Sequence, residues 1–550
     1  MNLAWLPGAE RKRSGSLRVA AVATEYRPWS HADVILGRLI QGYALDVAPR
    51  WPDVQLRALY IDQFPSTDLS RALSKQYGFP IVPTIREAIL DTSGKLDVDG
   101  VLLIGEHGNY PTNDREQTLY PRRRFFEETV AAFEAAGEVA PVFNDKHLAA
   151  RWEDAKWMYE KAKALKIPFM AGSSVPLSWR RPWLEIPLGA RIDEALSVGY
   201  AGLEAYGFHA LETLQCMVER RQGGEAGVTA VQCVEGPAVW EAMRAGRFSR
   251  ELLAAALRCH EPLIDGDFET RCPNPAAYFI EHADGFRSTC LMLNPLAGGF
   301  LFAARLAGDV RPVASQFWLE EPVFGHFGYL THAILEMVRT GKPQYPVERT
   351  VLTTGILSAV MDSRFEKGRR IETPDLKIPY QAVDHDLGAY RHPLAANGRD
   401  GGWIELFNRR DLAGWSEIRP AASSVRWEVV DGVLLGRDGA GTLVSLEEFG
   451  EFELFAELRG TGPEGAVALS LRTRPFVEPP VVGVEIRCPS GSWMTLRVRA
   501  AGGRFHAAAN GLTLLDRVQL PTPAARGAVA LRLLEPTARL EVRELRIRRV

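Results

Sequence analysis

Three side chains of types used in acid–base catalysis stand out in the chain: Lys146, His209 and Glu212. Oxidising a hydroxyl group needs a base for the O–H proton, and a histidine that titrates near neutrality suits that role. A lysine can orient the hydroxyl, stabilise developing oxyanion charge, or act as a base when its pKa is lowered. Glu212 follows His209 by three residues, so on a helix the carboxylate can orient the imidazole. The same residues also fit a surface lysine and a histidine that caps the core.

More polar residues surround the predicted strand ends. Glu106 and His107 directly follow an apolar run, and the carboxyl ends of parallel strands are favoured ligand positions. A routine polar turn explains them equally well. Asp145 and His147 flank the lysine and can form a polar cluster, or a metal site with His107 and His209. No ligand spacing supports a metal, so we expect none.

Two further segments carry residue types that bind ligands. His31 lies in PWSHADVI, from which it can approach a bound ligand or cap the following helix. Trp179, Arg180 and Arg181 lie in SWRRPWLE, where rings can stack on sugar C–H faces and arginines can fork onto hydroxyls or acids. Packing between domains explains these three residues equally well.

The elements that position these residues fall into three segments. Over residues 17–172, apolar runs alternate with helical patterns, including a helix expected over 32–48, which predicts a doubly wound parallel α/β sheet. Residues 173–380 mix helical and strand-like stretches, which indicates an α+β domain built on an antiparallel sheet. Residues 381–400 read as a linker. Short strands separated by Gly and Pro over 401–550 predict an all-β sandwich.

Composition excludes several classes of protein. The 550 residues carry a formal net charge of −3, without the basic excess of a general nucleic-acid binder. No apolar stretch approaches the roughly 18–20 residues that cross a bilayer, so we expect no membrane partner. The N-terminal tail, residues 1–16, has no apolar region typical of a signal peptide, and the six cysteines form no CxxC pair. These features favour a cytoplasmic protein.

Residues 17–380 resemble the Gfo/Idh/MocA oxidoreductase family. PVFNDKHLA is similar to the family's E-K-P-L-A element, with Lys146 on the position of its lysine. GYAGLEAYGFHALETL is similar to the G-x-H-x-x-D motif, with His209 and Glu212 on its positions and Glu204 one step from a frequent aspartate. The resemblance implies a Rossmann-like nucleotide-binding domain over 17–172, a substrate domain over 173–380, and catalytic roles for these four residues.

The same resemblance implies NAD or NADP as cofactor. The residues expected around it are Glu25, His31, Asp62, Glu106 and His107. Asp62 is placed to accept a hydrogen bond from a ribose. The loop after the first strand, ATEYRPWSHADVI, departs from the family, because it has no glycine where G-x-G-x-x-G lets backbone amides approach a pyrophosphate. Glu25 would repel a phosphate if it pointed inward.

Residues 401–550 resemble the 3-keto-disaccharide hydrolase domain, formerly DUF1080, a concanavalin-like jelly roll. The matching stretches include WIELFNRRDLAGW at 403–415 and WEVVDGVLLG at 427–436. The family's frequent N-S-G-I-x-x-R strand reads GAVALSLRTR here. This segment also has no lysine, because Lys377 is the last in the chain.

Together the two resemblances imply a carbohydrate-active protein. The first module would oxidise or reduce a sugar or glycoside hydroxyl, with Trp179, Arg180 and Arg181 as substrate contacts, and the jelly roll would bind or process the same glycoside. A 3-keto group acidifies the neighbouring C–H, so a keto-glycoside can be cleaved by elimination. The alternative is a non-redox sugar-binding or scaffold protein with a degenerate Rossmann domain, which the missing glycines favour. A small-molecule sugar and a homo-oligomer are the expected partners.

Overall fold

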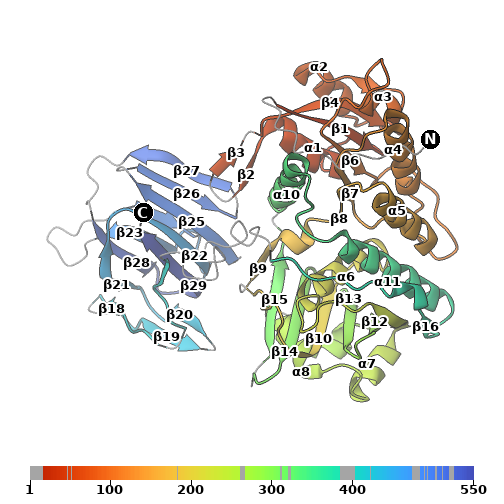
Figure 1. Ribbon diagram of the computed structural model, residues 1–550. Helices are drawn as coiled ribbons and strands as arrows, with labels where there is room; N and C mark the ends of the chain where they lie inside the picture. The colour runs from red at the N-terminus through yellow and green to blue at the C-terminus, as the bar shows by residue number, and fades with distance from the viewer. Residues whose placement is uncertain are drawn as a thin grey trace. The chain divides into compact units, whose positions relative to one another are not determined.

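The structure is a computed structural model in which the chain divides into two compact units (Figure 1). The N-terminal unit comprises Met1–Tyr43 and Arg50–Leu387, and the C-terminal unit comprises Ala44–Pro49 and Gly388–Val550. Apart from Ala44–Pro49, the expected domains 17–172 and 173–380 both fall in the first unit. Among the described residues, no helix is both long and apolar enough to span a bilayer.

The structure describes most of the chain. The described residues are 16–45, 48–50, 52–181, 184–260, 267–309, 312–319, 324–384, 403–409, 411–420, 423–430, 432–473, 484–488, 490–491, 493–501, 504–510, 512–519 and 526–549. The expected tail over 1–16, except its last residue, and the expected linker over 381–400, except its first four residues, lie outside these ranges.

A six-stranded parallel sheet with the order β5-β4-β1-β6-β7-β8 confirms the doubly wound, Rossmann-like fold. Its strands are β1 Leu17–Ala23, β4 Val54–Ile61, β5 Ile81–Val82, β6 Gly100–Ile104, β7 Val142–Asp145 and β8 Phe169–Gly172. The helices between them are α1 His31–Gln41, α2 Ser70–Tyr77, α3 Ile85–Ile89, α4 Arg122–Ala136 and α5 Trp152–Ala164. Since the strands are parallel, their carboxyl ends meet at one edge, where polar side chains from distant segments can gather.

The helix expected over 32–48 is shorter than predicted. It ends at Gln41, because Gly42 adopts a φ of 85° that a continuing helix cannot accommodate. Two short strands follow and pair with each other, β2 Tyr43–Leu45 and β3 Ala48–Arg50. The apolar spacing of the segment did not reveal this change of structure.

A second sheet of eight strands completes the N-terminal unit, in the order β16-β11-β12-β13-β10-β14-β15-β9. Its strands are β9 Trp179–Arg181, β10 Ile192–Gly199, β11 Val228–Glu235, β12 Asn274–His282, β13 Arg287–Asn294, β14 Phe300–Leu306, β15 Val313–Trp318 and β16 Ile371–Glu372. The pairings are antiparallel as predicted, except that β10 and β13 run parallel.

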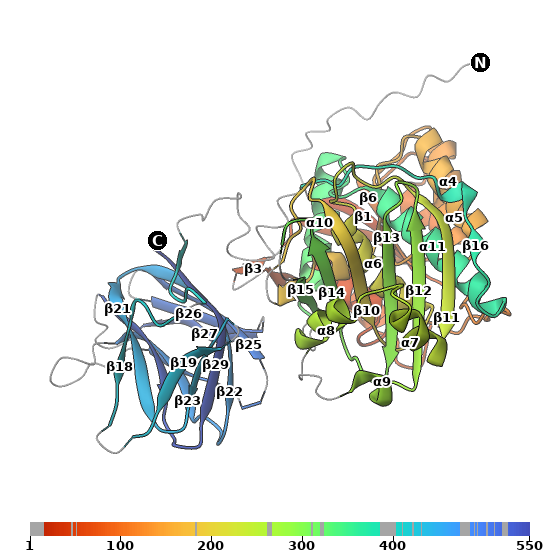
Figure 2. The same cartoon turned by 90° about the horizontal axis from the view of Figure 1, so that it is seen from below.

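Helices pack on both faces of this second sheet, which makes its strands apolar on both sides. They are α6 Ala205–Val218, α7 Pro237–Arg244, α8 Arg250–Arg258, α9 Phe268–Arg271 and α11 Val347–Phe365. A further helix, α10 Phe327–Thr340, packs instead against α1 beside the parallel sheet. Figure 2 shows α7 and α8 in front of the sheet and α6 and α11 behind it. α6 also carries two of the predicted catalytic residues.

The C-terminal unit is the predicted β-sandwich. One sheet has the order β19-β20-β29-β22-β25-β26-β27, with β17 paired to β29, and the other has the order β18-β21-β28-β23-β24. The strands are β17 Trp403–Glu405, β18 Trp415–Ile418, β19 Arg426–Val430, β20 Val433–Arg437, β21 Gly441–Phe449, β22 Phe452–Thr461, β23 Val467–Thr473, β24 Val484–Arg487, β25 Trp493–Ala501, β26 Arg504–Ala509, β27 Leu512–Gln519, β28 Gly527–Leu533 and β29 Arg539–Arg549. The paired strands of both sheets are antiparallel, as expected of a jelly roll.

Candidate functional site

The carboxyl edge of the parallel sheet holds three strained residues. Trp29, His107 and Lys146 follow β1, β6 and β7 and have φ values of 63°, 71° and 68°. A residue other than glycine in this left-handed region costs about 1–3 kcal/mol, and such strain clusters at functional sites. The loops that leave this edge are therefore held in conformations that local sequence alone would not favour.

Lys146, His209 and Glu212 form a connected centre at this edge. The Lys146 ammonium donates to His209 Nε2 over 2.5 Å, and Nδ1 on the other side of the ring lies 3.2 Å from Glu212 Oε2. Ser173, which follows β8, donates to the same carboxylate through its backbone N–H at 2.9 Å and its hydroxyl at 2.5 Å. The three residues expected to act together are thus in contact.

Burial sets the protonation states of this centre. Burial, reinforced by the charge of Lys146, lowers the pKa of His209 well below its usual value, so the imidazole is neutral. Burial raises the pKa of Glu212 to about 7, against the opposing hydrogen bonds from Ser173. A neutral imidazole between an ammonium group and a carboxyl group that titrates near neutrality can relay a proton in either direction.

A second group of charges supports the lysine from the side of β6. Glu106 Oε1 lies 3.6 Å from Lys146 Nζ, and Glu106 Oε2 accepts a hydrogen bond from Arg122 at 2.5 Å. Burial raises the pKa of Glu106, but the charges of Lys146 and Arg122 outweigh it and hold that pKa well below its usual range. His147 Nε2 lies 2.9 Å from Arg122 and 3.0 Å from Glu204 Oε1. In the contacts of the described residues, Glu204 is linked to the centre through His147, Arg122 and Glu106.

His31, Asp145 and His107 gather beside this centre. His31 is the first residue of α1, and its Nδ1 lies 2.6 Å from Oδ2 of the fully buried Asp145. The rings of His31 and His107 meet edge to face with centroids 5.2 Å apart. His107 Nδ1 accepts from Arg27 at 3.3 Å, and Arg27 also pairs with Glu25 at 2.6 Å. Burial lowers the pKa of His107 to about 4, so this ring is neutral as well.

Asp62 already has its hydrogen bonds satisfied within the chain. The hydroxyls of Tyr60 and Tyr110 each donate to its carboxylate at 2.7 Å, and Arg124 forms an ion pair with it. Burial raises the pKa of Asp62, but the hydrogen bonds from Tyr110, Tyr60 and Arg124 outweigh that effect and lower it overall. A ribose would have to displace these donors to reach the carboxylate.

In the loop after β1, side chains likewise accept hydrogen bonds from the loop's own backbone N–H groups. Ser30 Oγ accepts from the backbone N–H groups of Arg27 and Asp33, and the Asp33 carboxylate accepts from the N–H of Trp29 at 2.9 Å. The side chain of Tyr26 is completely buried beneath the loop. A pyrophosphate needs free amides and no nearby carboxylate at a helix N-terminus. Together with Asp62, these contacts do not fit a bound dinucleotide.

The expected substrate contacts Trp179, Arg180 and Arg181 lie on β9. The indole N–H of Trp179 donates to Tyr329 at 2.5 Å, and Arg180 donates to the carbonyls of Ser178 and Pro176. The guanidinium group of Arg180 stacks on Phe317, and that of Arg181 on Trp318. No contact described for these three residues joins them to Lys146 or His209.

Sequence reasoning missed Arg122 and Ser173. Arg122 opens the run Arg122–Arg124 at the start of α4, where cations oppose the helix dipole, and that mismatch was the available signal. Ser173 directly follows β8, so the strand-end rule applied to Glu106 would have found it. Among the described residues, no group of three or more His, Cys, Asp or Glu side chains is arranged to hold a metal ion.

Comparison with known proteins gives separate matches for the two regions. A family model described as a 3-keto-alpha-glucoside-1,2-lyase-like domain matches residues 402–489, which confirms the resemblance inferred from the motifs of the C-terminal segment. No curated protein matches the chain.

Solved structures resemble the rest of the chain. GenD2 from gentamicin A biosynthesis, in complex with NAD, is 15% identical with a TM-score of 0.41, over 67% of this chain and 99% of that one. The apo scyllo-inositol dehydrogenase from Lactobacillus casei is 11% identical with a TM-score of 0.41, over 65% and 98%. The myo-inositol 2-dehydrogenase from Lactobacillus plantarum is 11% identical with a TM-score of 0.41, over 65% of this chain and 99% of that one.

Proposed function

We propose that the protein is a carbohydrate-active enzyme whose N-terminal unit carries out acid–base chemistry on a keto-glycoside. The observation that carries this proposal is the buried contact of Lys146 Nζ with His209 Nε2, backed by Glu212 and Ser173. The ammonium group of Lys146 can stabilise the oxyanion that forms when a ketone enolises. His209 and Glu212 can then supply or remove the proton that accompanies this change.

The substrate class rests on the C-terminal unit. Its match to a 3-keto-alpha-glucoside-1,2-lyase-like domain points to glycosides that carry a ketone. A carbonyl group acidifies the C–H next to it, so loss of that proton can expel the glycosidic oxygen at the following carbon. Such an elimination needs bases and acids at fixed positions but no oxidant, which suits the groups at the carboxyl edge.

A second candidate is oxidation of a sugar hydroxyl with NAD or NADP at the same centre. The positions of Lys146 and His209 in the family motifs favour it. It requires a bound dinucleotide, however, and the contacts of Asp62, Ser30 and Asp33 do not fit one. The contacts around the parallel-sheet edge therefore favour elimination over hydride transfer.

The test is turnover of methyl 3-keto-α-glucoside by the full chain without any nicotinamide. We expect release of methanol, a loss of about 10³-fold in Lys146→Ala, and no change in the control Lys75→Ala, which alters an exposed lysine on α2. Undiminished turnover in Lys146→Ala would assign the chemistry to the C-terminal unit and overturn the proposal. Absence of turnover in the parent protein would also overturn it, and would favour a sugar-binding or scaffold protein.

A further inference from the structure

The pair formed by His31 and Asp145 has the arrangement of a base and the carboxylate that orients it. Asp145 ends β7 with no exposed surface, and its Oδ2 accepts from His31 Nδ1–H at 2.6 Å. Its other oxygen, Oδ1, has no hydrogen-bond partner among the described residues. A buried carboxylate on Nδ1 fixes the tautomer of a histidine and leaves Nε2 free to take a proton.

Aromatic neighbours hold the His31 ring in place. His107 and Phe327 both contact it edge to face, with centroids 5.2 Å away and interplanar angles of 70° and 78°. The His31 side chain keeps 14% of its surface exposed, whereas Asp145 keeps none. The ring is therefore clamped on its sides while part of it remains reachable, as a residue that meets a substrate must be.

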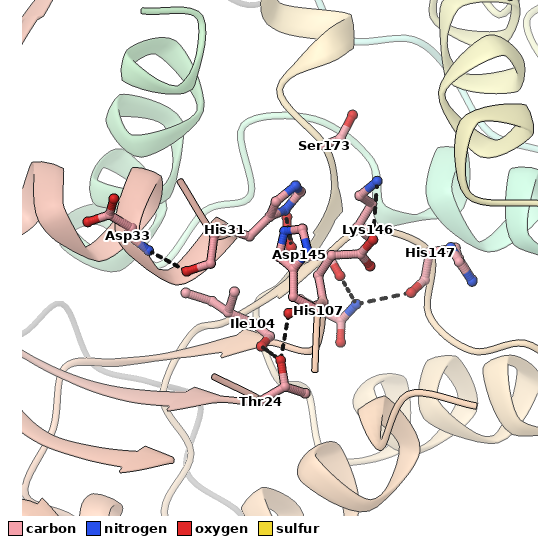
Figure 3. Close-up of polar contacts among 12 residues, drawn as sticks. Thr24, His31, Asp33, Ile104, His107, Asp145, Lys146, His147 and Ser173 are labelled. Atoms are coloured by element: carbon pink, nitrogen blue, oxygen red, sulfur yellow. Dashed lines mark hydrogen bonds and ion pairs between the residues drawn. The ribbon is translucent and has the colours of Figure 1, made fainter. Parts of the chain in front are cut away.

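The pair faces the same edge as the lysine centre. Asp145 directly precedes Lys146 at the end of β7, and Figure 3 shows His31 pointing toward Asp145 beside Lys146. The charge that His31 can carry contributes, after burial and Lys146, to lowering the pKa of His209. It also acts on Glu106. The two histidines thus lie within electrostatic range of each other, on separate hydrogen-bonded carboxylates.

We propose that His31, oriented by Asp145, is a second catalytic acid–base residue, which handles the proton on carbon while Lys146 and His209 handle the charge and proton on oxygen. This inference rests on the proposed function and deepens it. The loop after β1, which lacks the glycines of a dinucleotide site, then has a use of its own, since it presents His31 at the sheet edge.

The step balances without an oxidant. His31 Nε2 takes the proton from the carbon next to the ketone, and the electrons of the C–H bond form a C=C bond as the carbonyl oxygen becomes an enolate beside Lys146. The enolate then restores C=O, its C=C electron pair moves to form a new double bond between the deprotonated carbon and the anomeric carbon, and the C–O bond from the anomeric carbon to the glycosidic oxygen breaks. That oxygen takes a proton from the Lys146–His209 pair and leaves as an alcohol. The products are an unsaturated ketone and the alcohol, and proton exchange with water resets both groups.

Hydrogen exchange separates this step from bond cleavage. The full chain is incubated in D₂O with 1,5-anhydro-3-keto-glucitol, which has the ketone and the adjacent C–H but carries a hydrogen in place of the glycosidic oxygen. Deuterium uptake is followed by mass spectrometry. We expect uptake by the parent protein, a loss of at least about 100-fold in His31→Gln, and a smaller loss in Asp145→Asn with little change in KM. The control is His332→Gln, a histidine on α10 outside the cluster, with parent-like uptake.

Each outcome has a distinct meaning. Loss of uptake in His31→Gln at an unchanged melting temperature supports the inference. Parent-like uptake in His31→Gln, together with loss in Lys146→Ala, overturns the role of His31 and leaves the proposed function intact. If His31→Gln does not fold, Asp145→Asn decides, because parent-like uptake in that variant overturns the orienting role. If the parent protein neither takes up deuterium nor cleaves methyl 3-keto-α-glucoside, the proposed function itself fails.

Discussion

Two carboxylates at the same sheet edge are in opposite situations. Asp62, directly after β4, receives hydrogen bonds from Tyr60 and Tyr110 and an ion pair from Arg124. Asp145, at the end of β7, is more deeply buried, yet one of its oxygens has no partner among the described residues and the other holds only His31. The hydrogen-bonding capacity of the Asp62 carboxylate is satisfied by neighbouring side chains. The Asp145 carboxylate instead orients His31, which we propose acts on a substrate.

The difference divides the edge into a closed half and a working half. Around β4 and the first turns of the loop after β1, the hydrogen bonds of Asp62, Ser30 and Asp33 stay within that region, whereas His31 of the same loop turns to Asp145 of the working half. On the side of β7 and β8, the strained Lys146 and the buried Glu212 hold charge at a cost to stability. Strain and poorly compensated charge are often retained where a fold does chemistry, which agrees with the proposal that the chemistry takes place at β7 and β8.

The largest expected effect on stability concerns Glu212. Its pKa is raised to about 7 in the folded chain from an ordinary value of 4.5, so the folded state binds the extra proton. The stabilisation of the folded state by protonated Glu212 is fully present below pH 4.5 and is lost as the pH rises through 7. Its loss lowers the free energy of unfolding by on the order of 3 kcal/mol. Glu212→Gln cannot ionise. Between pH 4.5 and 8, its free energy of unfolding should therefore rise by about that amount relative to the parent protein.

Urea unfolding of both proteins across this pH range measures the effect. Glu128→Gln, on the partly exposed surface of α4, serves as control and should run parallel to the parent protein. If the free energy of unfolding of Glu212→Gln had the same pH dependence as that of the parent protein, the pKa of Glu212 would not be raised. Glu212 could then not hold a proton near neutral pH for the proposed chemistry.

A smaller effect is expected in the closed half. Asp62→Asn keeps one acceptor oxygen but loses the charge that pairs with Arg124, so the free energy of unfolding should fall by about 1 kcal/mol. Turnover of methyl 3-keto-α-glucoside should stay within about twofold of the parent protein, because Asp62 only satisfies its neighbours. A large loss of turnover at unchanged stability would show that Asp62 takes part in the chemistry, and would contradict the contrast drawn between Asp62 and Asp145.

From the sequence, the residues of the working half could be predicted, but most of the contacts between them could not. The family motifs and the helical spacing of His209 and Glu212 grouped these two residues with Lys146, and the structure brings the three into contact. The pairing of His31 with Asp145 spans 114 residues, and no local pattern encodes such a contact. Arg122 was missed because a run of arginines also reads as a solvated helix start.

The closed half was predictable only in part. The missing glycines in ATEYRPWSHADVI indicated a departure from dinucleotide binding. The hydroxyl of Tyr110, which helps to satisfy Asp62, comes from a loop 48 residues away, so only the tertiary fold shows that the ribose position is taken. From its place at the end of a predicted strand, Asp62 was therefore expected among the cofactor contacts.

The central claim is that this edge works without a dinucleotide. Calorimetric titration of the full chain with NAD, NADH, NADP and NADPH tests it most directly. We expect no binding by any of the four at concentrations up to about 1 mM, in a protein that turns over methyl 3-keto-α-glucoside. Binding in the micromolar range that is lost in Asp62→Asn would contradict it, because the carboxylate would then exchange its tyrosines and arginine for a ribose.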